Sequence, residues 1–252
     1  MEENIKITDA IWEKKNLGDS VYEVIVNEKA KTTELDPIFK LDRDLVYVKV
    51  HYNNFEIIKK LSNENFTYIE NQFTIQKRLQ KVFIPELFTK TLRFFDTQII
   101  SSKKESEIIF NELDKGLFTS DRFAIDENFG IKVSNFRYKN WISDMINSGD
   151  YEVNLIKTKE GKVPVSFFIN KYQGKTAHAI LGGVFTDFKN SGIGHSFIYF
   201  AIEHSLKQNC KVLQTQISSN NIPIFNIYSS IFGFEIKDNY VVFKKNTQDV
   251  RN

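Results

Sequence analysis

Hydrophobic and polar positions change their spacing several times along the first third of the chain. Residues 20–26 and 44–51 alternate with period two and are rich in β-branched and aromatic side chains, which predicts two strands. Residues 53–63 repeat apolar side chains at helical spacing, after two asparagines that suit a helix N-cap. Residues 66–79 favour a bent strand or two strands. The pattern therefore predicts the order strand, strand, helix, strand.

From residue 93 onward the pattern predicts alternating helices and strands. Helices are expected where apolar side chains recur every three or four positions, at residues 106–118, 133–146, 193–208 and 221–231. Strands are expected at residues 93–100, 151–158, 163–172, 176–185 and 211–218, with a terminal hairpin over 233–245. The pattern resets around residues 81–92. We therefore expect a mixed α/β (α+β) fold class, with a smaller domain at 1–90 and a larger one at 91–252.

Composition and charge exclude several classes of protein. Hydrophobic residues make up 41% of the chain and charged residues 26%, an ordinary balance for a globular protein. The net charge of only +2 argues against a general nucleic-acid binder, because neutralising phosphates needs clustered Lys and Arg. The single cysteine, Cys210, allows no internal disulfide and no cysteine-based zinc site, which fits a reducing cytoplasm and no metal. No apolar run reaches the ~20 residues of a membrane span.

The strand expected at 176–185 runs into a short loop that contains Gly192, Ile193 and Gly194, and a helix follows. Glycines let a backbone approach a ligand closely, and the free N–H groups at a helix start favour a phosphate or pyrophosphate. The dinucleotide fingerprint would need a third glycine where Phe197 stands, and no Gly-Lys-Ser/Thr of a Walker loop follows. A pyrophosphate site and a plain strand-to-helix turn both remain open on this pattern.

The segment 189–194, Lys-Asn-Ser-Gly-Ile-Gly, resembles the acyl-CoA pyrophosphate loop of the GNAT acetyltransferase superfamily. That loop reads Gln/Arg-x-x-Gly-x-Gly/Ala, so Lys189 keeps the positive charge but lacks the planar fork of Arg. Further on, Asn221, Tyr228 and the Gly-Phe pair at 233–234 resemble the family's downstream signature, with one extra residue between Tyr and Gly. The resemblance implies a GNAT fold from residue 93 onward, with a mixed central sheet and splayed strands.

The resemblance also implies the roles of individual residues. Acyl-CoA would be the cosubstrate, with its pantetheine arm between the strands at 176–185 and 211–218, and no metal would be used. The residues implied to bind it are Val184, Lys189, Asn190, Ser191, Gly192, Ile193, Gly194, His195, Ser196 and Asn221. The N–H near Val184 would act as an oxyanion donor, and Tyr228 would be the general acid, unless it is only a packing residue. As the base, His178, Asp187 and ordered water remain open.

A narrower resemblance covers more of the chain. Trp12-Glu13, Gly18, the segment 121–123, Trp141 and Thr215-Gln216 resemble the dTDP-amino-sugar N-acyltransferase branch of the superfamily, of the dTDP-fucosamine acetyltransferase type. It implies that the first third is a degenerate, partial GNAT-like copy packed against the catalytic domain. Four residues would hold the nucleotide-sugar substrate: Arg122, Phe123, Trp141 and Gln216. Core packing remains an alternative for Phe123 and Trp141, and a satisfied polar group between the splayed strands for Gln216.

The function expected from this resemblance is a cytoplasmic, acyl-CoA-dependent N-acyltransferase that modifies the amino group of a dTDP-linked amino-deoxysugar. The donor would be acetyl-CoA or a short-chain acyl-CoA, and the product would serve surface polysaccharide biosynthesis. Two alternatives remain: a GNAT enzyme for another amine (a peptide, polyamine or antibiotic), and a non-catalytic acyl-CoA-binding module. Exposed strand edges also allow a homodimer, while neither nucleic acid nor membrane is expected as a partner.

Overall fold

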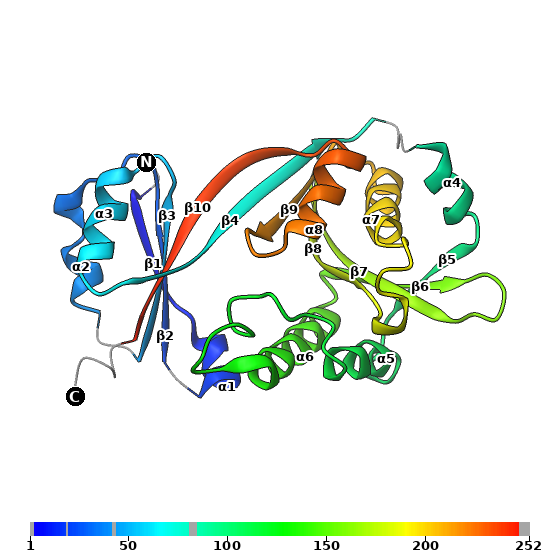
Figure 1. The fold of residues 1–252 in the computed structure, drawn as a ribbon, viewed down its shortest axis with the longest axis horizontal. Coiled ribbons are helices and arrows are strands. Elements are labelled where there is room, and N and C mark those ends of the chain that lie inside the picture. The colour runs from blue at the N-terminus through cyan, green and yellow to red at the C-terminus, as the bar shows by residue number, and fades with distance from the viewer. Residues whose placement is uncertain (1–2, 19, 42–43, 81–84, 247–252) are drawn as a thin grey trace. The chain divides into compact units, whose positions relative to one another are not determined.

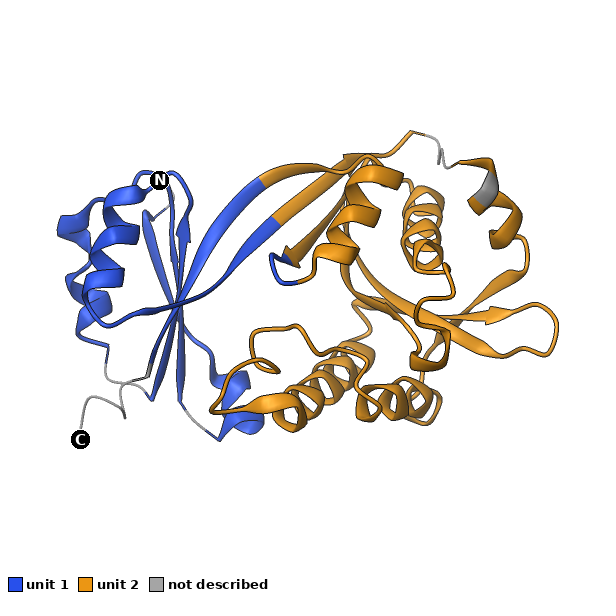
Figure 2. Ribbon diagram, viewed as in Figure 1, with its two compact units in different colours: residues 1–73, 218–220, 238–252 blue, residues 74–217, 221–237 orange. Residues whose placement is uncertain are grey.

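The computed structural model describes residues 3–18, 20–41, 44–80 and 85–246. The chain forms two compact units, coloured separately in Figure 2. The first unit comprises residues 1–73, 218–220 and 238–252, and the second comprises residues 74–217 and 221–237. Each unit is described below by itself.

The first unit holds the strands β1 (Ile5–Asp9), β2 (Val21–Val26), β3 (Leu45–His51), most of β10 (Glu235–Asn246) and the start of β4 (Thr67–Arg78). They lie in the order β1-β2-β3-β10-β4. β2 and β3 run parallel, whereas β1 and β10 run antiparallel to their neighbours β2 and β3. The helices of this unit are η1 (Ile11–Glu13), α1 (Lys14–Leu17), η2 (Thr32–Glu34), α2 (Asp36–Phe39) and α3 (Phe55–Asn63).

Helix α3 shows how the sequence forms this unit. The side chain of Asn54 accepts the N–H of Ile57, which caps the helix as the two asparagines predicted. Ile57 and Leu61 are fully buried and pack against the valines of β2 and β3. The helix therefore covers the sheet with one apolar face, as its sequence period requires.

The second unit holds β5 (Phe95–Ile100), β6 (Tyr151–Thr158), β7 (Pro164–Gln173), β8 (Thr176–Val184) and β9 (Val212–Ser218), joined by the end of β4. The order is β4-β9-β8-β7-β6-β5 (Figure 1). Neighbours from β5 to β8 are antiparallel, and β8 and β9 are parallel. Its helices are α4 (Glu86–Leu92), α5 (Lys103–Asp114), α6 (Gly130–Ser148), η3 (Thr186–Phe188), α7 (His195–Lys207), α8 (Ile222–Asn226) and the π-helical η4 (Ile227–Ile231).

Helices cover both faces of this second sheet. Phe167 and Ile169 of β7 belong to a buried cluster with Ile109 of α5 and Ile142 of α6. On the other face, the Asn170 amide donates to the Ala201 carbonyl of α7 at 3.0 Å. Alternate side chains of one strand thus meet different helices, which is the consequence of the strand's period of two.

The structure confirms the mixed α/β class and most of the predicted elements. It differs at the C-terminus, where the predicted hairpin over 233–245 is wrong. Residues 235–246 form one 12-residue strand that lies between β3 and β4. A strand with a partner on each side satisfies its N–H and C=O groups without folding back on itself.

The compact units also divide the chain differently from the boundary expected near residue 90. β4 begins in the first unit and ends in the second, whereas β10 begins in the second unit and ends in the first. The last part of β10 joins the first unit because Tyr240–Asn246 pair with β3. The sequence signals for β1, α1 and α2 were missed because these elements are short.

Candidate functional site

The two parallel strands β8 and β9 diverge after a few rungs. They pair from Thr176↔Val212 as far as Ala179↔Thr215, and beyond this rung each strand continues without the other. On its opposite edge β8 carries a bulge against β7, because the register passes from Ala179 to Leu181 and skips Ile180. A bulge bends a strand and increases its twist. We call the last shared rung, Ala179↔Thr215, the fork.

Two backbone amides of β8 face the open side of the fork. The Phe185 N–H donates to Val165 of β7 at 2.9 Å, and Val184 lies opposite Ser166 in the same ladder. Because successive N–H groups of a strand point to opposite edges, those of Val184 and Gly182 point away from β7. The structure thus gives Val184 the orientation that the sequence analysis expected of a donor. The N–H of Gly182 is a second outward donor, which the sequence analysis did not name. A glycine inside a strand can indicate that a ligand or another backbone approaches the strand closely.

The loop that follows β8 has the conformation of an anion cradle. Asn190 and Gly192 have φ of 64° and 80°, and Ser191 between them does not have positive φ. Alternation of this kind is typical of backbone nests that bind anions, but the N–H of Ser191 itself donates to the Phe188 carbonyl at 3.2 Å. The 13-residue helix α7 starts directly afterwards, so N–H groups of its first turn can add to the cradle. The N–H of Ser196 is not one of them, because it donates to the Ile193 carbonyl at 2.9 Å.

His195 stabilises the turn at the start of α7. Its side chain is almost completely buried, with its ring 4.4 Å from the ring of Phe88, centroid to centroid. Nδ1 lies 2.9 Å from the Gly192 carbonyl oxygen, which can only accept, so Nδ1 carries the hydrogen. Nε2 is buried without a hydrogen-bond partner. Burial lowers the pKa of His195, so the ring is neutral at pH 7.

A second set of contacts fastens the loop to the end of α5. The buried Glu112 carboxylate accepts the Thr186 N–H and the Lys115 ammonium, each at 2.7 Å. Burial alone would raise the pKa of Glu112, but these hydrogen bonds outweigh burial and hold the pKa below its ordinary value. Lys189 donates to the Gly116 carbonyl at 2.9 Å. In this structure Lys189 therefore positions the loop.

Tyr228 lies at the fork. Its ring is buried and stacks edge-on against Phe234 at 4.8 Å, and its hydroxyl lies near the side chain of Thr215. Thr215 donates to the Ala179 carbonyl at 2.8 Å, so the phenol lies beside the last shared rung. Burial raises the pKa of Tyr228 well above its ordinary value.

The extra residue between Tyr228 and Gly233 is explained by the π-helical turn of Ile227–Ile231. A π-turn accommodates one more residue than an α-turn and is frequent at functional sites. The sequence showed the additional residue, but only the structure shows where it is accommodated.

The remaining residues expected to bind the donor differ in their exposure and in the direction of their side chains. Asn190 and Ser191 are exposed on the loop, whereas the side chain of Ile193 is buried. The Ser196 hydroxyl points into the interior, 3.4 Å from that of Ser166, and its N–H donates to the Ile193 carbonyl at 2.9 Å. Asn221 precedes α8, where its carbonyl accepts the Phe225 N–H.

Three of the four residues expected to bind the acceptor lie together near the start of α6. The Arg122 guanidinium lies 5.1 Å from the buried Phe123 ring, and Arg137 lies 4.5 Å from that ring and 5.7 Å from Trp141. Arg137 is an addition that the sequence analysis missed, although it stands four positions before Trp141 on a helix and so shares its face. Gln216 is not part of this cluster and is exposed on β9.

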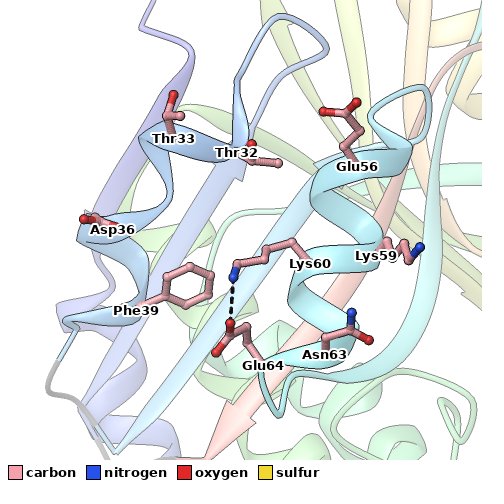
Figure 3. Close-up of a pocket in the computed structure, with 9 residues that line it drawn as sticks. All are labelled: Thr32, Thr33, Asp36, Phe39, Glu56, Lys59, Lys60, Asn63 and Glu64. Atoms are coloured by element: carbon pink, nitrogen blue, oxygen red, sulfur yellow. Dashed lines mark ion pairs between the residues drawn. The ribbon is translucent and has the colours of Figure 1, made fainter.

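A separate hollow of about 610 Å³ lies in the first unit (Figure 3). The residues that line it come from η2, α2 and α3: Thr32, Thr33, Asp36, Phe39, Glu56, Lys59, Lys60, Asn63 and Glu64. Lys60 and Glu64 form an ion pair at 2.8 Å within it. None of the predicted site residues lines this hollow.

The described part of the chain offers neither a metal-binding cluster nor a membrane-spanning helix. Among these residues, no group of three or more His, Cys, Asp or Glu side chains could hold a metal ion. Within the same residues, no helix has both the length and the apolar character to cross a membrane.

No protein-family model matches this sequence, and no curated protein matches it. Solved structures do resemble the fold. A GCN5-related N-acetyltransferase from Sphaerobacter thermophilus is 9% identical, with a TM-score of 0.63 over 96% of this chain and 75% of that chain. One from Kribbella flavida is 12% identical, with a TM-score of 0.57 over 90% and 81%. This chain has the GNAT fold.

A third similar structure is that of a functionally unknown conserved protein from Staphylococcus epidermidis, 14% identical, with a TM-score of 0.60 over 90% of both chains. Identities this low establish the GNAT fold and leave activity and substrate to the site itself. The resemblance stated from the sequence is thus confirmed at the level of the fold. The dTDP-amino-sugar branch and the first third as a degenerate copy stay predictions.

Proposed function

We propose that this protein is an acyl-CoA-dependent N-acyltransferase, in which an amine attacks the thioester directly. The observation that carries the proposal is the fork. One strand offers two outward amides, a phosphate cradle follows that strand, and a buried phenol lies beside the last rung. The anion cradle suits the pyrophosphate of coenzyme A, and the open side of β8 suits its extended pantetheine arm.

Each part of the site has a task in the reaction. The amine nitrogen forms a bond to the thioester carbonyl carbon, and the oxyanion that develops accepts N–H groups of β8. The C–S bond then breaks, and the departing sulfur takes the proton of Tyr228. The proton lost by the amine leaves through water, from which Tyr228 recovers its own. Holding both reactants at one fork supplies much of the rate enhancement.

Tyr228 can donate over a wide pH range. Burial raises its pKa above the ordinary value of about 10, so the phenol stays protonated at and well above neutral pH. We expect kcat to show no fall on the alkaline side between pH 7 and about pH 10. A loss of kcat in that range with an apparent pKa near 8 would assign the acid to another group.

The test is thiol release from acetyl-CoA and short-chain acyl-CoA with a panel of amines. Tyr228→Phe should lower kcat by about 10²–10⁴-fold, the usual contribution of a general acid, with little change in the calorimetric Kd for CoA. Tyr199→Phe, which removes a hydroxyl from α7, is the matched control and should leave kcat unchanged. Absence of CoA binding, or an unchanged kcat in Tyr228→Phe, would contradict the proposal.

For the acceptor we propose a dTDP-linked amino-deoxysugar, acylated in the cytoplasm. Its support is the cluster of Arg122, Arg137, Phe123 and Trp141, since guanidinium groups pair with phosphates and aromatic rings stack on bases or sugars. The panel should therefore include dTDP-amino-sugars beside polyamines and peptides. Turnover of a polyamine or peptide, with no turnover of any dTDP-amino-sugar, would overturn this choice while leaving the N-acyltransferase intact.

A further inference from the structure

A row of polar side chains crosses the second sheet one rung before the fork. The ladders place Tyr151 of β6 opposite Lys171 of β7, and Lys171 opposite His178 of β8. His178 in turn lies opposite Gln214 of β9, whose side-chain amide donates to Gln76 of β4 at 3.1 Å. Side chains directly opposite each other share a face, so these residues form one row.

Among the described residues, neither Lys171 nor His178 forms an ion pair with a carboxylate. Lys171 and His178 face each other, a like-charge arrangement that is destabilising across strands once the histidine is protonated. The pKa of His178 is lowered, first by partial burial and then by the nearby charges of Lys171 and Lys237. The Lys171 ammonium lies over the Tyr151 ring, 4.8 Å from the ring centroid.

The two segments that carry Lys171, His178 and Gln214 are free of acids, whereas Tyr151 is flanked by Asp150 and by Glu152, whose carboxylate is paired with His204. No Asp or Glu occurs from Gly161 to Thr186 or from His204 to Phe234, in a chain that is otherwise close to neutral. Two more lysines gather at the origin of β8 and β9, where the Lys211 N–H donates to the Lys175 carbonyl at 2.7 Å. The lysines and the lack of acids in these two segments favour a positive potential at this end of the two strands.

The row is within reach of the reacting groups. It precedes the fork by one rung, and His178 lies four positions before Gly182, roughly 13 Å along the strand at 3.3 Å per residue. Tyr151 packs against the buried cluster that contains residues of α5 and α6, so the row lies on that face of the sheet. An amine held at the fork can extend a substituent along this face as far as the row.

We propose that Lys171 and His178, with Lys237 nearby, bind a phosphate group carried by the amine acceptor. This inference rests on the proposed function, because it assigns the row to the second substrate. Phosphate is favoured over carboxylate because Lys171 and His178 lie opposite each other on one face and Lys237 adds to the positive field at His178, which suits a dianion. Lysine binds phosphate as a point charge. An amine without a phosphate leaves the cations uncompensated, so the row selects for phosphorylated acceptors.

The test follows the histidine resonances of the full-length protein by NMR during a titration with inorganic phosphate at pH 6.5. The protein is first saturated with CoA, so that the cradle before α7 is occupied and cannot report on phosphate. His178→Gln assigns the His178 signal among the four histidines. We expect a saturable shift of His178 towards the protonated form, and no shift of His51 or His204. Acetate at the same concentration should produce a much smaller shift.

Variants decide whether the row is the binding site. Lys171→Ala should weaken phosphate binding about tenfold, and Lys171→Arg should largely retain it, because the charge remains. Lys207→Ala, which removes a lysine paired with Glu203 on α7, is the control and should change nothing. No saturable shift, an equal shift with acetate, or equal binding in Lys171→Ala would overturn the proposal.

The outcome is separable from that of the proposed function. If calorimetry shows that CoA does not bind, the acyltransferase proposal fails, and the same titration of the protein alone still reports on the row. If CoA binds and His178 does not respond, the acyltransferase proposal stands and the phosphate specificity fails.

Discussion

At the scale of single residues, the two glycines of the loop before α7 are required for different reasons. Gly192 has a φ of 80° and open space around it, so only its backbone conformation favours glycine. Gly194 has an ordinary helical φ of −56°, but a Cβ there would lie 3.2 Å from Cδ1 of Ile227. Ile227 adjoins Tyr228, so Gly194 links the loop to the π-turn that carries the phenol.

We therefore predict different kinetic effects of Gly192→Ala and Gly194→Ala. The first strains the loop by about 1–2 kcal/mol and should raise KM for acyl-CoA with little change in kcat. The second displaces Ile227 and should lower kcat as well, because Tyr228 moves with its neighbour. Steady-state thiol release for both variants provides the comparison. Indistinguishable profiles would mean that the Gly194–Ile227 contact does not position Tyr228.

His195 offers a prediction in which stability and affinity respond differently. His195→Phe keeps a ring beside Phe88 but removes the bond to the Gly192 carbonyl, which is worth about 0.5–1.5 kcal/mol. KM for acyl-CoA should rise by up to about tenfold, because this bond shapes the cradle. Stability in urea should stay equal or increase, since the unpaired buried Nε2 disappears as well. Loss of stability with unchanged KM would give His195 a purely structural role.

At the scale of elements, α7 is joined to the strands by a hydrogen-bond network around Glu152 of β6. Its Oε1 lies 2.8 Å from Nδ1 of His204 on α7 and also accepts the amide of Asn154 and the hydroxyl of Tyr172. His204 extends the network to Thr97 of β5, at 3.1 Å. Burial by itself raises the pKa of Glu152, but these hydrogen bonds outweigh burial and lower the pKa.

This lowered pKa predicts a pH-dependent contribution to stability. A carboxylate whose pKa is lower in the folded state stabilises the fold above its unfolded pKa of about 4.3 and loses this contribution as pH falls below it. Glu152→Gln should cost about 1–3 kcal/mol at pH 7, measured by urea unfolding, and its difference from the parent protein should shrink at pH 4. Glu203→Gln on α7, whose partner is the exposed Lys207, is the control and should cost at most about 0.5 kcal/mol. A cost for Glu152→Gln that is the same at both pH values would contradict the prediction.

At the scale of the whole molecule, the chain passes between its two units along strands. β4 carries it from the first unit to the second, and β10 carries it back. Because the end of β10 pairs with β3 through the register Tyr240↔His51 to Asn246↔Leu45, the first unit is incomplete without the C-terminal segment.

A chain truncated after Lys237 should therefore fail to form a stable first unit. The truncation leaves the inner edge of β3 without its partner and removes Phe243 from the buried cluster of this unit. Hydrogen exchange should show β3 and α3 unprotected, whereas α7 keeps its protection. A chain that ends at Asn246 retains every described pair of β10 and is the control. Full protection of β3 in the shorter chain would contradict the role of β10.

Local sequence signals were sufficient to predict most of the elements and the type of fold. Residue period and turn chemistry are local, so they fixed the strands at 20–26 and 44–51, the capped helix after Asn54, and the loop of Gly192 and Gly194. The order of these elements, read together with a few motif residues, then sufficed for the GNAT resemblance. Elements predicted from local signals of this kind agree with the structure because their formation does not depend on distant partners.

Contacts between residues that are distant in sequence could not be predicted and are seen only in the tertiary structure. The fork depends on where β8 and β9 cease to pair, and the cationic row depends on the register across several strands. The inward turn of Ser196, the exposed place of Gln216 and the unbroken course of β10 likewise follow from partners far along the chain. A one-residue change of register would move every such side chain to the other face, and no local pattern records that choice.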